Sequence, residues 1–325
     1  MYKHFYGLTL APFEVSPDPF FLFPTPRHNE ALAALYYGVR RYKGFVVLTG
    51  EVGTGKTLLL RCLLDLFARS RVAYACVLNP SLSPVEFLQY IMGEFGLQVR
   101  GKSKGEILVE LSHFLIARHR QGLSTVLVVD EAQHLSREML EEIRLLTNLE
   151  TSQHKLLQIV LVGQSELEEA LASPRLRQLR QRIALWCRLT ALTEQETAHY
   201  IARRLELAGL SPNRPPLFLP DAVYLIHQFS RGIPRLINIM CDNSLIAAYG
   251  QQAPVVTPDV VAQVAAEFRL HLGEDPGKTN GNGHGNYVAV LRKLREVLDS
   301  FQEIDADHIP DSLPSGEAEH HEQRV

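Results

Sequence analysis

The sequence of 325 residues is poor in cysteine, has one tryptophan and lacks long apolar runs. Its four cysteines are far apart and form no Cys-x-x-Cys pair, which argues against a disulfide framework and against a zinc site. We therefore expect small, buried apolar side chains in a reducing compartment at the four positions, Cys62, Cys76, Cys187 and Cys241.

No apolar run approaches the roughly 18 residues that a membrane span needs. The first residues, Met1 to Tyr6, also lack the apolar centre of a signal peptide. We therefore expect a cytoplasmic protein, which would lie at the inner membrane only through a partner.

Charge of one sign is also scarce, because 33 basic and 36 acidic side chains leave a formal net charge of −3. From Glu274 onward the chain holds five basic and eleven acidic residues, so the part before it is mildly basic. This imbalance is too weak to predict tight DNA binding from charge.

A glycine-rich phosphate loop follows the apolar run Phe45 to Thr49 and fits the pattern G-x-x-x-x-G-K-S/T. Backbone N–H groups of such a loop, with the following helix N-terminus, are suited to hold phosphate oxygens. Lys56 would reach the β- and γ-phosphates, and the Thr57 hydroxyl would ligate Mg²⁺. The predicted nucleotide-binding residues are Gly50, Glu51, Val52, Gly53, Thr54, Gly55, Lys56, Thr57 and Leu58.

Two acidic residues end the apolar stretch Thr125 to Val129, which is typical of a strand buried in a parallel sheet. Asp130 would hold Mg²⁺ together with Thr57, and Glu131 would activate the attacking water. Two acids at a strand end can also be plain surface residues, but the upstream phosphate loop favours the functional interpretation.

Polar residues end two further predicted strands, 72–78 and 157–162. Gln164 could reach the γ-phosphate or orient the water, or it is a surface glutamine. Asn79 could hydrogen-bond Glu131 and keep it inactive until a partner binds. Alternatively, Asn79 only forms a turn.

Arginines are dense before the predicted strand 184–189, and a planar guanidinium could be presented to the γ-phosphate of a neighbouring subunit. Arg182 is the preferred candidate, with Arg177 and Arg180 next. A solvated helix face or a nucleic-acid patch is the alternative. Arg235, at the start of a helix that Pro234 opens, would project toward the nucleotide, or it is a cap-region arginine.

Strands alternating with helices predict an α/β core, and the later part of the chain predicts helices alone. Five prolines preclude a helix in residues 1–26, whose aromatics need burial and could wall the adenine. The expected organisation is an arm and helix packed on the core (1–43), a nucleotide-binding core (44–192), a helical lid (193–271), a flexible linker (272–286), an amphipathic helix (287–305) and an acidic, disordered tail (306–325).

The amphipathic stretch carries apolar residues at three- and four-residue steps from Tyr287 to Ile304. One such helix cannot bury its apolar face alone, so we expect it to dock on its own body, on a second copy or on a protein partner. Self-association through this stretch would make the chain chiefly a scaffold.

Together, these motifs resemble the AAA+ ATPases across residues 1 to 270. Phe5-Tyr6-Gly7-Leu8, Ser16-Pro17-Asp18-Pro19, Asp130-Glu131-Ala132-Gln133 and Val162-Gly163-Gln164 are similar to the general secretion pathway protein A group and to secretion ATPases of exosortase and exopolysaccharide loci. The resemblance implies a parallel sheet of order 5-1-4-3-2, ATP hydrolysis with Mg²⁺, and ring or filament oligomers with active sites between subunits.

The expected function is therefore an ATPase that powers or regulates assembly of a secretion, export or exopolysaccharide system. The group's membrane span and peptidoglycan-binding domain are not recognised here, which favours action through a partner. The alternative is a DNA-binding regulator similar to the transposition ATPases MuB and TnsC. DNA-stimulated ATP turnover with a steep salt dependence would favour that alternative.

Overall fold

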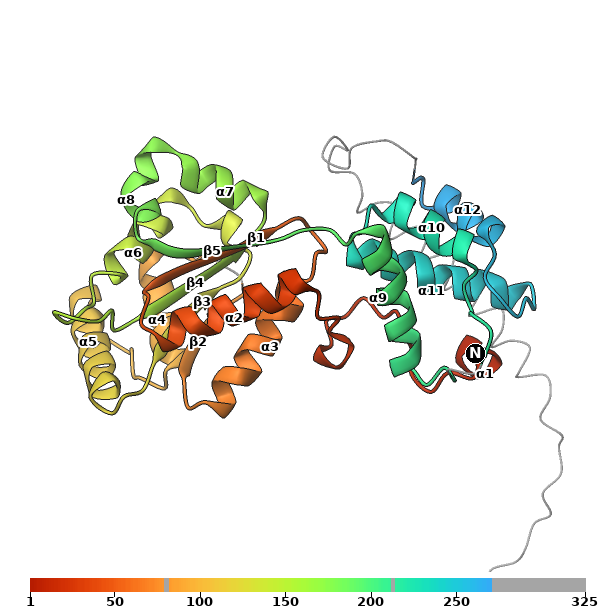
Figure 1. The fold of residues 1–325 in the computed structure, drawn as a ribbon. Helices are drawn as coiled ribbons and strands as arrows, with labels where there is room; N and C mark the ends of the chain where they lie inside the picture. Colours follow the sequence, from red (N-terminus) through yellow and green to blue (C-terminus); the bar gives the residue numbers. More distant parts are fainter. Residues whose placement is uncertain (79–81, 212–213, 271–325) are drawn as a thin grey trace, which may run out of the picture. The chain divides into compact units, whose positions relative to one another are not determined.

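The computed structural model describes residues 1–78, 82–211 and 214–270 (Figure 1). The described residues all belong to one compact unit. Asn79, the linker, the amphipathic stretch and the acidic tail lie outside the described residues, so their predictions stay as they are.

Five parallel strands form one sheet in the order β2-β3-β4-β1-β5, which confirms the predicted order 5-1-4-3-2. Each strand lies within one residue of the stretch that the sequence predicted. The three central strands are fully buried, as their continuous apolar runs indicate, whereas β2 and β5 at the edges are partly exposed. The strands are β1 (Phe45–Gly50), β2 (Ala73–Val77), β3 (Thr125–Val129), β4 (Gln158–Gly163) and β5 (Ile183–Leu189).

Helices cover both faces of this sheet (Figure 1). Val46 and Leu48 share one apolar cluster with α2 (Pro26–Arg40) and α3 (Lys56–Arg69). Phe45 and Val47, which alternate with them, belong to the cluster on the other face. The helices that contribute to this second cluster are α4 (Pro84–Glu94), α5 (Lys104–Arg120), α6 (Arg137–Leu146), α7 (Ser165–Ala172) and α8 (Arg177–Arg180).

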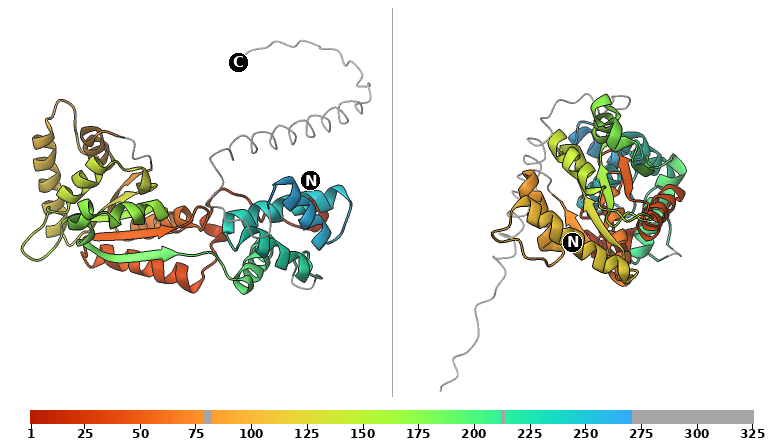
Figure 2. Two further views of the ribbon diagram at one scale, coloured as in Figure 1. Left: turned by 90° about the horizontal axis from the view of Figure 1, so that it is seen from above. Right: turned by 90° about the vertical axis from the view of Figure 1, so that its left-hand side faces the viewer.

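Four further helices of the described residues pack around a separate apolar cluster and are here called the helical lid (Figure 2). Thr193 and Glu196 form the predicted capping box, which starts the first helix of the lid by satisfying its exposed N–H groups. The lid helices are α9 (Glu194–Leu207), α10 (Pro220–Ser230), α11 (Pro234–Gly250) and α12 (Pro258–Glu267).

The N-terminal arm differs from the prediction in two ways. A short helix, α1 (Tyr2–Tyr6), precedes the first proline at residue 12, so the prediction of no helix was wrong there. Tyr6 and Phe13 are buried in the core of the helical lid instead of the nucleotide-binding core. The later part, around the 3₁₀ turn η1 (Pro19–Phe21), contacts α3 of the core.

A buried arginine fastens the arm to the lid. Arg204 is 4% exposed and donates to the carbonyl oxygen of Pro12 and to the Tyr200 hydroxyl, the latter at 2.8 Å. Its guanidinium lies 4.6 Å from the centre of the Phe21 ring. These contacts replace the water that a buried charge would otherwise need.

The cysteines also depart from the prediction. Cys241 is buried, but Cys62, Cys76 and Cys187 are partly exposed, and all four are free thiols. Burial raises the pKa of Cys76 to about 11, so this thiol stays protonated and unreactive at neutral pH.

Gly232, in the turn between α10 and α11, is expected to tolerate no side chain. It has a φ of +73°, and an added Cβ would lie 1.9 Å from the carbonyl oxygen of Leu192. Gly232→Ala should therefore lower the free energy of unfolding by about 2–4 kcal/mol, measured by urea denaturation. Gly93→Ala, a control in α4 with no atom within 4 Å of the added Cβ, should be neutral or slightly stabilising. Equal stability of the two variants would contradict this packing.

Candidate nucleotide-binding site

The phosphate loop connects the end of β1 to the start of α3, as predicted. Gly53 and Gly55 have φ values of +81° and +99°, which glycine adopts without strain. The backbone of Gly53 also lies close to the lid, because an added Cβ would be 2.8 Å from Cβ of Arg235. Glycine at these positions therefore shapes both the loop and its contact with the lid.

Lys56 starts α3 and points back across its own loop. It is 7% exposed, and its Nζ donates to the carbonyl oxygens of Gly50 at 2.8 Å and Glu51 at 2.9 Å. Burial lowers the pKa of Lys56, while the negative charges of Glu131 and Asp130 act in the opposite direction. A buried ammonium among neutral carbonyls is a strong donor for an anion that can reach it.

The end of β3 faces the start of α3. The Thr57 hydroxyl donates to Oδ2 of Asp130 at 3.4 Å, and the N–H of Glu131 donates to Oδ1 at 2.9 Å. Asp130 is 5% exposed, and burial raises its pKa. The two oxygen-bearing side chains predicted to hold Mg²⁺ therefore lie together.

Glu131 turns away from Asp130, since its backbone is left-handed at a φ of +50°. Its Oε2 accepts a hydrogen bond from Nε2 of Gln164 at 3.1 Å. Gln133 donates to the same oxygen, a contact that the sequence reasoning missed. The only signal for Gln133 was its place in the family motif.

One cavity of about 170 Å³ is lined by Lys56, Thr57, Glu131 and Gln164 together with neighbouring residues. Residues 14–18 of the arm form part of its wall, where the sequence predicted a wall for the adenine. The lid contributes Arg235, whose backbone N–H donates to the carbonyl oxygen of Gly53 at 3.2 Å. The full lining is Glu14, Val15, Ser16, Pro17, Asp18, Val52, Gly53, Gly55, Lys56, Thr57, Leu58, Glu131, Gln164, Tyr200, Arg204, Pro234, Arg235 and Asn238.

A buried histidine supports the loop from α2 and was not predicted. His28 is 7% exposed, its Nδ1 lies 2.7 Å from the Thr25 hydroxyl, and its Nε2 lies 3.3 Å from the carbonyl oxygen of Thr54. Burial lowers the pKa of His28, so the ring is neutral at physiological pH. It therefore ties the start of α2 to the phosphate loop without adding charge.

Arg182 lies against the end of α6, and its predicted role at a neighbouring subunit stays a prediction. Its Nη1 donates to Oδ1 of Asn148 at 2.7 Å, to the carbonyl oxygen of Arg144 at 3.3 Å and to the Thr147 hydroxyl. The guanidinium thus satisfies acceptors at the end of α6, where a positive charge is favourable. Arg177 and Arg180 are exposed on α8.

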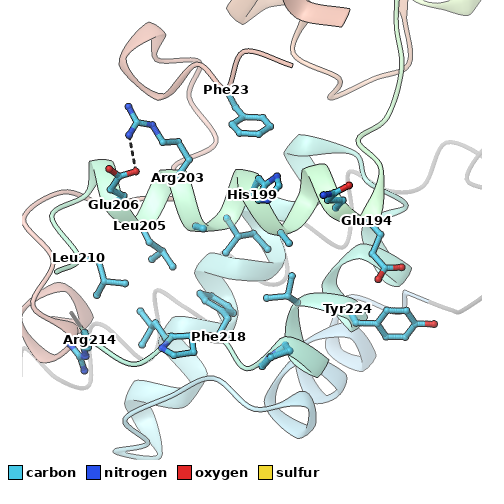
Figure 3. A pocket seen from close by; sticks show the side chains of 18 of the residues that line it. Phe23, Glu194, His199, Arg203, Leu205, Glu206, Leu210, Arg214, Phe218 and Tyr224 are labelled. Atoms are coloured by element: carbon cyan, nitrogen blue, oxygen red, sulfur yellow. Dashed lines mark hydrogen bonds and ion pairs between the residues drawn. The ribbon is translucent and has the colours of Figure 1, made fainter. Parts of the chain in front are cut away.

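A larger cavity, of about 1160 Å³, lies in the helical lid and contains no residue of the phosphate loop. Figure 3 shows Phe23, Leu205, Phe218 and Tyr224 among its lining side chains, with the ion pair of Arg203 and Glu206 at its side. Its mostly apolar lining offers no cradle for phosphate. The smaller cavity is therefore the candidate nucleotide site.

Within the described ranges, no helix has the length and apolar character required to cross a membrane.

Comparison with known proteins finds sequences that are similar to this chain. Residues 39–171 match the family model described as an AAA domain. The chain is also 45% identical over 269 residues to the General secretion pathway protein A of Aeromonas hydrophila, which covers 82% of this chain and 48% of that protein. The chain therefore spans about half the length of this relative.

Solved structures share the fold at low sequence identity. The CDC6P protein of Pyrobaculum aerophilum has a TM-score of 0.58 at 20% identity, covering 84% of this chain and 72% of that chain. The Aeropyrum pernix ORC2 protein, solved in ADPNP-ADP complexes, has a TM-score of 0.54 at 19% identity, covering 78% and 72%. The RuvB Holliday junction branch migration motor of Thermotoga maritima has 0.53 at 19%, covering 82% and 76%.

The sheet order, the phosphate loop facing an acidic strand end and the AAA domain match together show a P-loop fold of the AAA+ type, and over 269 residues the chain is similar to General secretion pathway protein A.

Proposed function

We propose that this chain binds ATP with Mg²⁺ and hydrolyses it to ADP and phosphate. The observation that carries the proposal is the 3.4 Å approach of the Thr57 hydroxyl to Asp130, beside the buried ammonium of Lys56. A metal-binding oxygen pair next to a phosphate loop is the arrangement that phosphoryl transfer requires.

The residues present fit the nucleotide and its metal. Lys56 would exchange its two carbonyl acceptors for phosphate oxygens, which are stronger acceptors because they carry charge. Thr57 and Asp130 would supply oxygen ligands to Mg²⁺. The metal would neutralise charge on the phosphates.

Glu131 and Gln164 would act on the attacking water. Glu131 would accept a proton from the water, whose oxygen forms a bond to the γ-phosphorus while the bond to the bridging oxygen of ADP breaks. Gln164 would orient the water or donate to the γ-phosphate. Both side chains line the cavity that holds the phosphate loop.

The lid would respond to the nucleotide through Arg235. Its backbone already contacts Gly53, so a shift of the phosphate loop is transmitted directly to the start of α11. The Arg235 side chain is exposed and lines the cavity, where it could reach a phosphate. The arm, fastened to the lid by Arg204, would move with it.

We further propose that the protein works as a homo-oligomer, a ring or filament with ATP sites between subunits. An arginine of one subunit would then stabilise the charge that spreads over the γ-phosphate in its neighbour. Arg177 and Arg180 are exposed and suited to this role, whereas Arg182 would first have to leave the end of α6.

Mixing two inactive variants tests both ATP hydrolysis and the proposal that each ATP site is shared between two subunits. Arg177→Ala and Arg180→Ala should each be mixed with Glu131→Gln across a range of ratios, and phosphate release from ATP measured with Mg²⁺. At equal amounts of the two variants, we expect at least one mixture to recover about a quarter of wild-type turnover. In random oligomers half of the interfaces join the two variants, and half of these combine an intact arginine with an intact Glu131. Arg182→Ala should be mixed in the same way, since Arg182 is the candidate preferred from the sequence; a variant that keeps wild-type turnover on its own does not supply the shared arginine. Absence of rescue at every ratio would contradict shared sites.

The cellular role that we propose is assembly or regulation of a secretion, export or exopolysaccharide system at the cytoplasmic side of the inner membrane. Support comes from the identity to General secretion pathway protein A, which this chain covers in part. A protein partner would bind through residues 287–305, whose apolar pattern needs a covering surface.

A further inference from the structure

Gln133 joins the two side chains that face the attacking water, although it does not itself line the cavity. It lies in the 3₁₀ turn η2 (Ala132–His134), directly after Glu131 at the end of β3. Its Nε2 donates to Oε2 of Glu131, and its Oε1 accepts from the backbone N–H of Gln164 at 3.1 Å. A single amide therefore uses both of its ends within the site.

A third hydrogen bond closes the ring. Nε2 of Gln164 donates at 3.1 Å to the same Oε2 of Glu131. Since β3 and β4 are neighbouring strands, the ring links the ends of both. No residue within the described ranges donates to Oε1 of Glu131.

The backbone of Glu131 needs such support. A φ of +50° is uncommon for a residue with a side chain and costs free energy unless its surroundings fix it. The two amide donors on Oε2 supply that restraint, because the carboxylate can rotate only by breaking both bonds.

The fold also reserves space for the Gln133 amide. A Cβ added to Gly163, the last residue of β4, would lie 3.1 Å from Oε1 of Gln133 and 2.7 Å from Cδ2 of Leu167. A side chain at this position would therefore press on the amide. The absence of a side chain keeps the ring of hydrogen bonds intact.

We propose that Gln133 is a positioning residue that holds Glu131 and Gln164 as one rigid unit facing the γ-phosphate. This inference rests on the proposed ATPase function, because Gln133 acts only through Glu131 and Gln164. A general base must be held within hydrogen-bond reach of its water, and loss of an orienting partner lowers the rate without loosening nucleotide binding.

The test compares turnover with nucleotide affinity in the full chain. Gln133→Ala removes both bonds, and Gln133→Glu keeps an acceptor for the Gln164 N–H but cannot donate to Glu131. We expect both variants to lose about 10–100-fold in kcat for ATP, as for other outer-shell partners. ADP affinity by calorimetry and the unfolding temperature should stay at wild-type values.

Two controls make the outcome decisive. Gln153→Ala, at an exposed glutamine whose side chain makes no hydrogen bond to another described residue, should match the wild type in every measurement. In a Glu131→Gln background, Gln133→Ala should change the residual turnover less than about twofold, because residues acting as one unit are not additive.

Wild-type kcat in both Gln133 variants, while Glu131→Gln is inactive, would overturn the inference. A parallel loss of ADP affinity and kcat would also overturn it, since that pattern indicates a merely structural role. No ATP turnover by the wild type would refute the proposed function instead, and the role of Gln133 with it.

Discussion

Lys56→Ala is expected to bind ADP and ATP at least about 100-fold more weakly than the wild type and to release no phosphate from ATP. The ammonium of Lys56 lies in the phosphate loop, 7% exposed, and donates to two loop carbonyls. Two charge-assisted bonds to phosphate are worth about 3 kcal/mol together, or about 100-fold in affinity.

Calorimetry with ADP measures this loss directly, and urea denaturation separates it from unfolding. Alanine removes a buried charge along with its bonds, so the fold should remain intact. Lys43→Ala is the matched control, because Lys43 is exposed and precedes β1, whereas the phosphate loop follows β1. An ADP affinity equal to that of the wild type would rule out the proposed role of Lys56.

Glu131→Gln is expected to keep nucleotide affinity but to lose about 10²–10⁴-fold in turnover, because an amide cannot accept the proton of the attacking water. The substitution is isosteric, so the side chain can still fill the space between Gln133 and Gln164. ATP should therefore stay bound, and the proposed oligomer should accumulate in its ATP-bound form.

Single-turnover phosphate release, with ADP affinity measured in parallel, checks this expectation. Glu138→Gln is the control, since Glu138 is exposed on α6 and does not line the cavity. Turnover at the wild-type rate in Glu131→Gln would assign the proton transfer to another group.

The parts of the site that lie next to strand ends could be predicted from the sequence. Apolar runs fixed the strands, and parallel strands bring their carboxyl ends to one edge, so Thr57, Asp130 and Gln164 were expected to meet. The structure places Thr57 and Asp130 3.4 Å apart and Gln164 against Glu131.

Contacts between distant segments could not be predicted in this way. The aromatic arm clearly needed burial, but its partners, such as Arg204 with the carbonyl of Pro12, lie about 190 residues away in the chain. The hydrogen bonds of Arg182 to the end of α6 were hidden for the same reason. Periodicity reports which face of an element is apolar, and does not say what covers it.

The role of Gln133 could not be predicted for a different reason. A glutamine two residues after an acidic strand end carries no local pattern that indicates a role. Its function depends on the left-handed backbone of Glu131 and on the bare backbone of Gly163, and both emerge only in three dimensions.

The central claim is that a nucleotide and its magnesium lie between the phosphate loop and the end of β3. Isothermal titration calorimetry of the full chain with ADP, with and without Mg²⁺, tests it most directly. We predict saturable binding near one nucleotide per chain, strengthened by Mg²⁺ and lost in Lys56→Ala. No heat of binding for ADP or ATP at any Mg²⁺ concentration would contradict it.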